Sequence, residues 1–116
     1  MKLNDNLYED KGNADDIQEP YFGYTLSIIS GKWKLLVIYY LSKNGTVRFN
    51  ELQRMIGKIT YKTLSTTLKE MQADGLVHRK EYPQIPPKVE YSLTDKGKTL
   101  WPIIQEMCQW GEHNHD

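Results

Sequence analysis

The spacing of hydrophobic positions changes several times along the chain, and each change predicts a new element. From Tyr24 to about Ser30 the apolar residues are spaced for a short helix. The stretch WKLLVIYYL over residues 33–41 is apolar on nearly every side of a helix. Such a helix is either central to a core or covered by a second subunit. Asn44 and Gly45 are suited to end it.

The next segment predicts a short strand, a helix and a turn. Residues 46–48 (TVR) are too few for more than a short strand. In FNELQRMIG, residues 49–57, the apolar positions fall on one face of a short helix. A tight turn follows, so two helices are expected in quick succession.

The second of these helices is predicted over residues 60–74 (TYKTLSTTLKEMQAD). Thr60 is a suitable N-cap, and Gly75 is placed to stop the helix. The stripe expected to be buried consists of Leu64, Leu68 and Met71.

A hairpin and a last helix complete the pattern. The runs VHRKEY (77–82) and KVEYSL (88–93) are strand-like, and the second alternates apolar and polar residues. The prolines of PQIPP between them predict a stiff, protruding tip. Thr94 caps the last helix, which Pro102 should kink or break.

The element order predicts an α+β fold of the winged helix-turn-helix class, mostly helical with a short hairpin wing. Residues 20–113 form the expected domain, since 116 residues suffice for one. The polar, acidic residues 1–19 are expected to form a mobile tail, and residues 114–116 a short C-terminal one.

The distribution of charged residues along the chain indicates what kind of partner the protein binds. The formal net charge is zero, but residues 25–90 carry 11 Lys and Arg against 5 Asp and Glu. This local excess can steer a polyanion such as DNA. There is no run of about 18 apolar residues and no signal-peptide pattern, and the single cysteine fits a reducing cytoplasm. We therefore expect a cytoplasmic protein without a membrane partner.

The face of the 60–74 helix opposite its buried stripe is small, hydroxylic and basic, which suits contact with base edges in the major groove. Cations before that helix pair and in the hairpin are expected to contact phosphates. The expected DNA-binding residues are Arg48, Asn50, Thr60, Tyr61, Lys62, Ser65, Thr66, Lys69, Arg79, Lys80 and Lys88. Two alternatives stay open: a solvated face that contacts nothing, and a winged helix that binds only protein, which the cationic face disfavours.

Several blocks together carry a family resemblance: GKWKLLV, RFNEL, ADGLVHR, YP-x-x-PPKVEYSLT and the closing W-G. Over residues 20–113 the chain resembles the HxlR-type winged-helix transcriptional regulators of bacteria and archaea. The resemblance implies a cytoplasmic homodimer on pseudo-palindromic double-stranded operators, joined through its N- and C-terminal helices. The apolar surface available for such an interface comprises Leu26, Ile29, Trp33, Leu36, Tyr40, Leu100, Ile103, Ile104, Met107 and Trp110.

Redox sensing is where the sequence departs from that family. Many members carry a sensor cysteine before the first core helix, and Pro20 stands at that position here. Cys108, in the last helix near the expected interface, remains. It is either an inert small apolar residue or an oxidation-sensitive one that perturbs the dimer.

No enzyme is expected, because the sequence has no phosphate loop, no Cys/His metal spacing and no nucleophile–base arrangement. His113 and His115 lie in the terminal segment, so neither a metal nor a cofactor is expected. A small-molecule effector is a further alternative. Five aromatic residues would then line a cavity at the dimer interface, or else belong to the core: Tyr24, Trp33, Tyr39, Tyr40 and Trp101.

Overall fold

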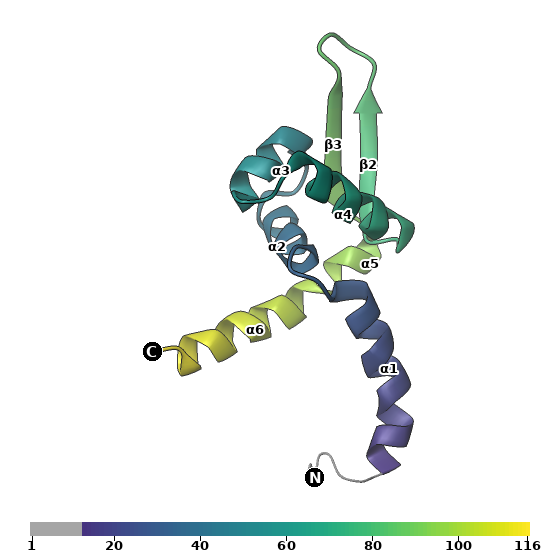
Figure 1. The fold of residues 1–116 in the computed structure, drawn as a ribbon, viewed down its shortest axis with the longest axis vertical. Helices are drawn as coiled ribbons and strands as arrows, with labels where there is room; N and C mark the ends of the chain where they lie inside the picture. Colours follow the sequence, from purple (N-terminus) through teal and green to yellow (C-terminus); the bar gives the residue numbers. More distant parts are fainter. Residues whose placement is uncertain (1–12) are drawn as a thin grey trace. The chain divides into compact units, whose positions relative to one another are not determined.

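The computed structural model describes the backbone of residues 13–116 and the side chains from residue 19 onward. The chain divides into two compact units, Met1–Ser30 and Gly31–Asp116. Figure 1 traces the elements of both. Within the described residues, no helix is both long enough and apolar enough to cross a membrane.

The first unit contains α1 (Asn13–Ile29), which begins earlier than predicted. Of the predicted 1–19 tail, residues 1–12 lie outside the described residues, while residues 13–19 belong to the helix. The prediction placed the start at Tyr24, although Ala14, Ile17 and Tyr21 already follow a helical spacing. The predicted end is confirmed: Gly31 follows with φ 103°, a conformation that suits glycine.

The core of the second unit is built from three helices, α2 (Lys34–Asn44), α3 (Phe49–Ile56) and α4 (Tyr61–Ala73). Their bounds match the predicted helices within one or two residues, and the buried stripe predicted for α4 is confirmed. The largest side chains with almost no exposed surface are Val37, Ile38, Leu41, Leu52, Leu64, Leu68, Met71 and Leu76. Only three residues of α2 are fully buried, so much of its apolar surface lies at or near the surface of one chain.

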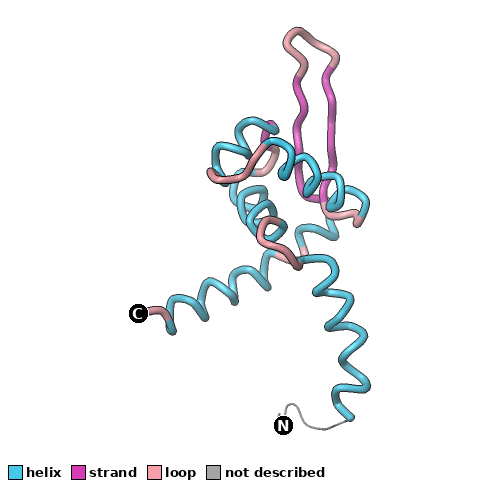
Figure 2. The backbone as a smooth tube through the Cα atoms, in the orientation of Figure 1, coloured by secondary structure: helices cyan, strands magenta, loops and turns pink. Residues whose placement is uncertain are grey.

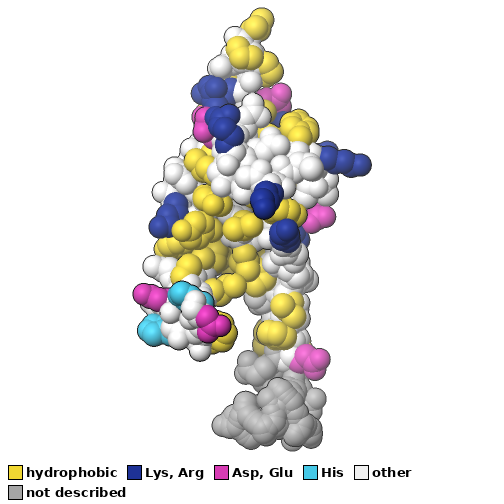
Figure 3. All heavy atoms as spheres, turned by 60° about the vertical axis from the view of Figure 1, so that its left-hand side comes forward, with side chains coloured by type: hydrophobic (Ala, Val, Ile, Leu, Met, Phe, Trp, Pro, Cys, Tyr) yellow, Lys and Arg dark blue, Asp and Glu magenta, His cyan; other side chains and the backbone are white. Residues whose placement is uncertain are grey.

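A three-stranded antiparallel sheet joins these helices, with strand order β1-β3-β2. Its strands are β1 (Val47–Arg48), β2 (Val77–Tyr82) and β3 (Lys88–Leu93), as predicted. The β2–β3 hairpin extends well past α3 and α4 (Figures 1 and 2). At its tip Ile85 is 100% exposed, and Figure 3 shows apolar side chains at the tip with Lys and Arg side chains below them.

The predicted last helix is broken into two, α5 (Asp95–Lys98) and α6 (Trp101–Asn114). Pro102 lies in the first turn of α6, where its missing N–H costs nothing, so the predicted break is confirmed. Thr94 caps α5, its Oγ1 accepting a hydrogen bond from the Gly97 N–H at 2.9 Å. Gly97 itself is buried, and a Cβ there would overlap the carbonyl oxygen of Leu76.

Candidate nucleic-acid interface

Helix α4 is held at both ends by local hydrogen bonds. At its start, Thr60 Oγ1 accepts a bond from the Thr63 N–H at 3.1 Å, as predicted for an N-cap. At its end, Gly75 adopts φ 76°. The N–H of Leu76 then reaches the Met71 carbonyl at 2.9 Å, and the N–H of Gly75 reaches that of Gln72 at 3.0 Å. This Schellman arrangement, with Leu76 buried, fixes where the helix stops and the hairpin begins.

The turn before α4 is also anchored. Ile59 is buried, and its carbonyl accepts a hydrogen bond from Gln53 Nε2 at 3.2 Å. The angle between α3 and α4 is therefore set by a core residue and by a side chain of α3. A fixed angle of this kind is what a helix-turn-helix needs to present its second helix to DNA.

The outward face of α4 is exposed, as predicted. Lys62, Thr66 and Lys69 are exposed, and Ser65 is half-buried. Among the described residues, neither lysine has an acidic partner within ion-pair distance. Glu70 is the acidic residue of this helix, and Lys34 of α2 neutralises it across 3.4 Å. The face therefore presents uncompensated positive charge.

A groove of about 580 Å³ runs between α4, the start of α3 and the hairpin. Phe49 contributes an aromatic wall, packed on Tyr61 at 4.8 Å and near Tyr91 at 6.3 Å between ring centroids. Seven of the eleven residues predicted to bind DNA line this groove: Arg48, Asn50, Tyr61, Ser65, Lys69, Arg79 and Lys88.

Acidic or aromatic neighbours contact each of the hairpin cations Arg79, Lys80 and Lys88. Arg79 Nη1 lies 3.2 Å from Glu81 Oε1, and its hydrogen bond to Tyr91 is the main cause of a raised pKa, so the guanidinium stays charged. Lys80 and Lys88 lie over the Tyr82 ring, with Nζ 5.0 and 4.2 Å from its centroid. Lys88 Nζ is also 3.6 Å from Glu90. The hairpin therefore carries less uncompensated positive charge than α4.

Four predicted residues do not line the groove: Thr60, Lys62, Thr66 and Lys80. Lys62 and Thr66 lie on the exposed face beside it. The Thr60 hydroxyl is already engaged, because it accepts from the Thr63 N–H and bonds to Thr63 Oγ1 at 3.0 Å. Thr60 therefore caps α4, and its contact with DNA stays a prediction.

Gln72 lines the groove and was not predicted. It lies three residues after Lys69 and seven after Ser65, so the helical periodicity was sufficient to find it. The predicted contacts on this helix ended at Lys69, one turn before Gln72. Pro87, Val89 and Tyr91 of the hairpin side were missed for another reason, because only the folded chain brings them against α4.

The predicted apolar surface divides into buried and exposed members. Leu100 and Ile104 are buried within their own chain, so they serve the core, and we remove them from the expected interface. Ile103, Met107 and Trp110, spaced four and three residues apart on α6, are 44, 51 and 70% exposed. Leu26 and Leu36 are exposed, while Ile29, Trp33 and Tyr40 are half-buried. Cys108 is exposed as well, which disfavours its interpretation as a buried inert residue in one chain.

Comparison with known proteins agrees with this geometry. Residues 28–116 match the family model described as HxlR-like helix-turn-helix. The chain is 60% identical over 111 residues to "Uncharacterized HTH-type transcriptional regulator BH0655" of Halalkalibacterium halodurans, covering 96% of this chain and 98% of that protein. The redox regulator HypR in its oxidized form superposes with a TM-score of 0.76 at 49% identity, covering 83% of this chain and 98% of the other. A protein from Porphyromonas gingivalis W83, described as a putative MarR-family regulator, superposes with a TM-score of 0.76 at 35% identity, covering 98% of this chain and 99% of the other.

Proposed function

The chain belongs to the HxlR-like helix-turn-helix family of transcriptional regulators, and we propose that it binds operator DNA as a homodimer. In each subunit α4 enters the major groove, and the hairpin follows the adjacent backbone. The two copies of α4 would lie about 34 Å apart, one turn of DNA, on a pseudo-palindromic site. No cofactor and no catalytic step are part of this function, which belongs in the cytoplasm.

The observation that carries the proposal is the exposed, uncompensated cationic face of α4 beside the groove. Lys62 and Lys69 flank small hydroxyl side chains that allow close approach to base edges. At the groove's edge, Arg48 and Asn50 lie at the start of α3, where backbone N–H groups also attract phosphate. Base reading is therefore assigned to α4, and phosphate contact to α3 and the hairpin.

The homodimer is supported by the unpartnered apolar face of α6. Three large side chains, Ile103, Met107 and Trp110, line a shallow hollow along the helix. Trp110 is 70% exposed in one chain, and a soluble monomer seldom leaves such a group of large apolar side chains uncovered. A second copy would cover this face with the same face, as two-fold symmetry requires.

A redox response would have to use Cys108, the single cysteine of the chain. A similar protein is named a redox regulator, but Pro20 stands where the family's usual sensor cysteine would lie. Cys108 neighbours Met107 on the apolar helix proposed for the interface. Oxidation there would introduce a polar group next to packed apolar surface and weaken the dimer.

The decisive experiment is selection of bound sequences from a random duplex pool with the purified protein. We expect enrichment of a two-fold symmetric motif whose half-sites are about 10 base pairs apart. The matched controls are two double variants: Lys62→Glu with Lys69→Glu on the α4 face, and Lys43→Glu with Lys96→Glu elsewhere. Only the first should abolish enrichment.

A protein that enriches no sequence and ignores duplex DNA even at low salt would overturn the proposal. That result would favour the alternative of a winged helix that binds protein alone. Enrichment of an asymmetric single half-site would retain DNA binding but contradict the homodimer.

A further inference from the structure

A second hollow, of about 840 Å³, opens near the base of the hairpin, and its volume lies in the range of small-molecule sites. It is distinct from the DNA groove, although both use β2 and β3. Arg79 and Tyr91, paired across the strands, line the groove, whereas the neighbouring pair His78 and Ser92 lines this hollow. Because side chains alternate along strands, the Arg79–Tyr91 pair and the His78–Ser92 pair point to opposite faces of the sheet. Of the aromatic residues predicted to line an effector cavity, Trp101 lines this one.

Unpartnered polar groups converge on this cavity. Within the described part of the chain, the side chains of Lys98, His78 and Asp95 have no hydrogen-bond or ion-pair partner. Ser42 Oγ is buried and also lacks a partner. A buried hydroxyl without a partner is uncommon in folded proteins and costs stability. Together these groups offer both charge and hydrogen bonds to a bound molecule.

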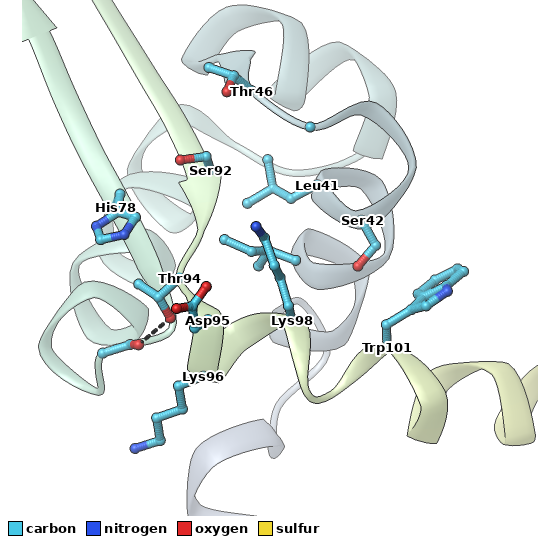
Figure 4. A pocket seen from close by; sticks show the side chains of 13 residues that line it. Leu41, Ser42, Thr46, His78, Ser92, Thr94, Asp95, Lys96, Lys98 and Trp101 are labelled. Atoms are coloured by element: carbon cyan, nitrogen blue, oxygen red, sulfur yellow. Dashed lines mark hydrogen bonds between the residues drawn. The ribbon is translucent and has the colours of Figure 1, made fainter.

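The two lysines of α5 point in different directions, and only one of them faces the cavity. Figure 4 shows the Lys98 ammonium directed over the cavity beside Leu41, whereas Lys96 points away from it. Lys96 Nζ bonds to the Asp74 carbonyl at 3.2 Å. One cation is therefore available to a ligand, and its neighbour on the same short helix is not.

The platform that carries Lys98 is rigid. Thr94 Oγ1 donates to the Gly75 carbonyl at 2.6 Å, and the Thr94 N–H reaches the Leu76 carbonyl at 3.0 Å. Gly97 packs so closely on Leu76 that no larger residue fits. The backbone that carries Lys98 is thus fixed beside the cavity before any ligand arrives.

The remaining walls are apolar. Leu41 and Leu93 are buried core residues that reach the cavity, and Trp101 closes the end opposite His78. An apolar wall with one free ammonium and a free hydroxyl suits a molecule with a flat apolar body and a single negative charge. Asp95 disfavours a second negative charge on the ligand.

We propose that this cavity binds a small aromatic monocarboxylate, with its carboxylate on Lys98 and its ring against Leu41, Leu93 and Trp101. This function goes beyond DNA binding. Its ligand would touch His78 and Ser92, the cross-strand pair next to Arg79 and Tyr91 of the DNA groove, so occupancy can bias the position of the hairpin.

The test uses three probes that share one ring and differ in charge: benzoate, benzamide and benzylamine. Their affinities are measured by calorimetry on the full chain without DNA. We expect benzoate to bind, benzamide to bind about tenfold more weakly or worse, and benzylamine to bind weakest, because the carboxylate gains a charge-assisted hydrogen bond. Amide chemical-shift changes on adding benzoate should gather at His78, Ser92 and Lys98.

Two matched variants locate the cation. Lys98→Gln should weaken benzoate binding about tenfold or more, while Lys96→Gln should leave it within about twofold. Ser42→Ala should also weaken it, and thermal melts confirm that each variant folds.

No benzoate binding at millimolar concentration, equal loss in the two lysine variants, or tightest binding of benzylamine would each overturn the proposal. Because no DNA is present, any of these failures would leave the proposed DNA-binding function untouched.

Discussion

Replacing Lys62 by alanine tests the electrostatic half of the proposed mechanism. Lys62 is exposed on α4 and has no acidic partner among the described residues. Its charge is therefore free to displace a counterion from DNA. Alanine favours helix at least as well as lysine, and the side chain supports no packing, so the fold should be unaffected.

The magnitude follows from counterion release. Each phosphate neutralised contributes about 0.9 to the slope of log affinity against log salt concentration. A homodimer carries two copies of Lys62, so the variant should lower the slope by about 1.8. Between 50 and 200 mM salt the affinity ratio of parent to variant should shrink by roughly tenfold.

The measurement is fluorescence anisotropy of a labelled duplex across a salt series. A non-specific duplex suffices, because this contribution does not depend on sequence. Lys43→Ala is the control, since Lys43 belongs to α2 and lies over the Tyr39 ring at 5.5 Å. Equal slopes for the parent and Lys62→Ala would refute the placement of α4 against DNA.

Four further predictions concern other parts of the molecule. Lys88→Ala should weaken binding about equally on all duplex sequences and lower the slope of log affinity against log salt by about one unit. This decrease is smaller than that expected for Lys62→Ala, because Glu90 partly compensates the charge of Lys88. An unchanged slope would remove Lys88 from the phosphate contacts. Gly97→Ala should lower the free energy of unfolding by about 1–3 kcal/mol in thermal or urea melts, because the added methyl overlaps the Leu76 carbonyl, and an unchanged midpoint would contradict this packing. Trp110→Glu should convert the dimer to monomer in sedimentation while Gln105→Glu does not; a parent that is already monomeric argues against the interface. Diamide should weaken operator binding by the parent but not by Cys108→Ser, and an equal response in both would rule Cys108 out as the sensor.

The sequence predicted the local features of the chain because each of them depends on residues that are close together along the chain. The bounds of β2 and β3, the Thr60 and Thr94 caps, the stop at Gly75 and the break near Pro102 all follow from short-range backbone chemistry. The outward face of α4 followed from helical periodicity alone. The start of α1 was missed because residues 13–19 were interpreted as part of an acidic tail, although Ala14, Ile17 and Tyr21 already follow a helical spacing.

Other properties depend on contacts between distant segments, which a linear pattern does not specify. The fold decides that Leu100, just before α6, and Ile104 within it are buried, while Ile103 and Trp110 of α6 are exposed. It pairs Lys34 with Glu70 and Lys88 with Glu90, and so leaves the free positive charge on α4.

The sequence by itself determined the order of elements and the character of each face, since helix and strand periods are local. Only the tertiary structure placed His78, Lys98 and Ser42 around one cavity and Arg48, Ser65 and Arg79 around another. Side chains from segments far apart meet only when the core has closed, because burial of apolar surface sets how the elements pack.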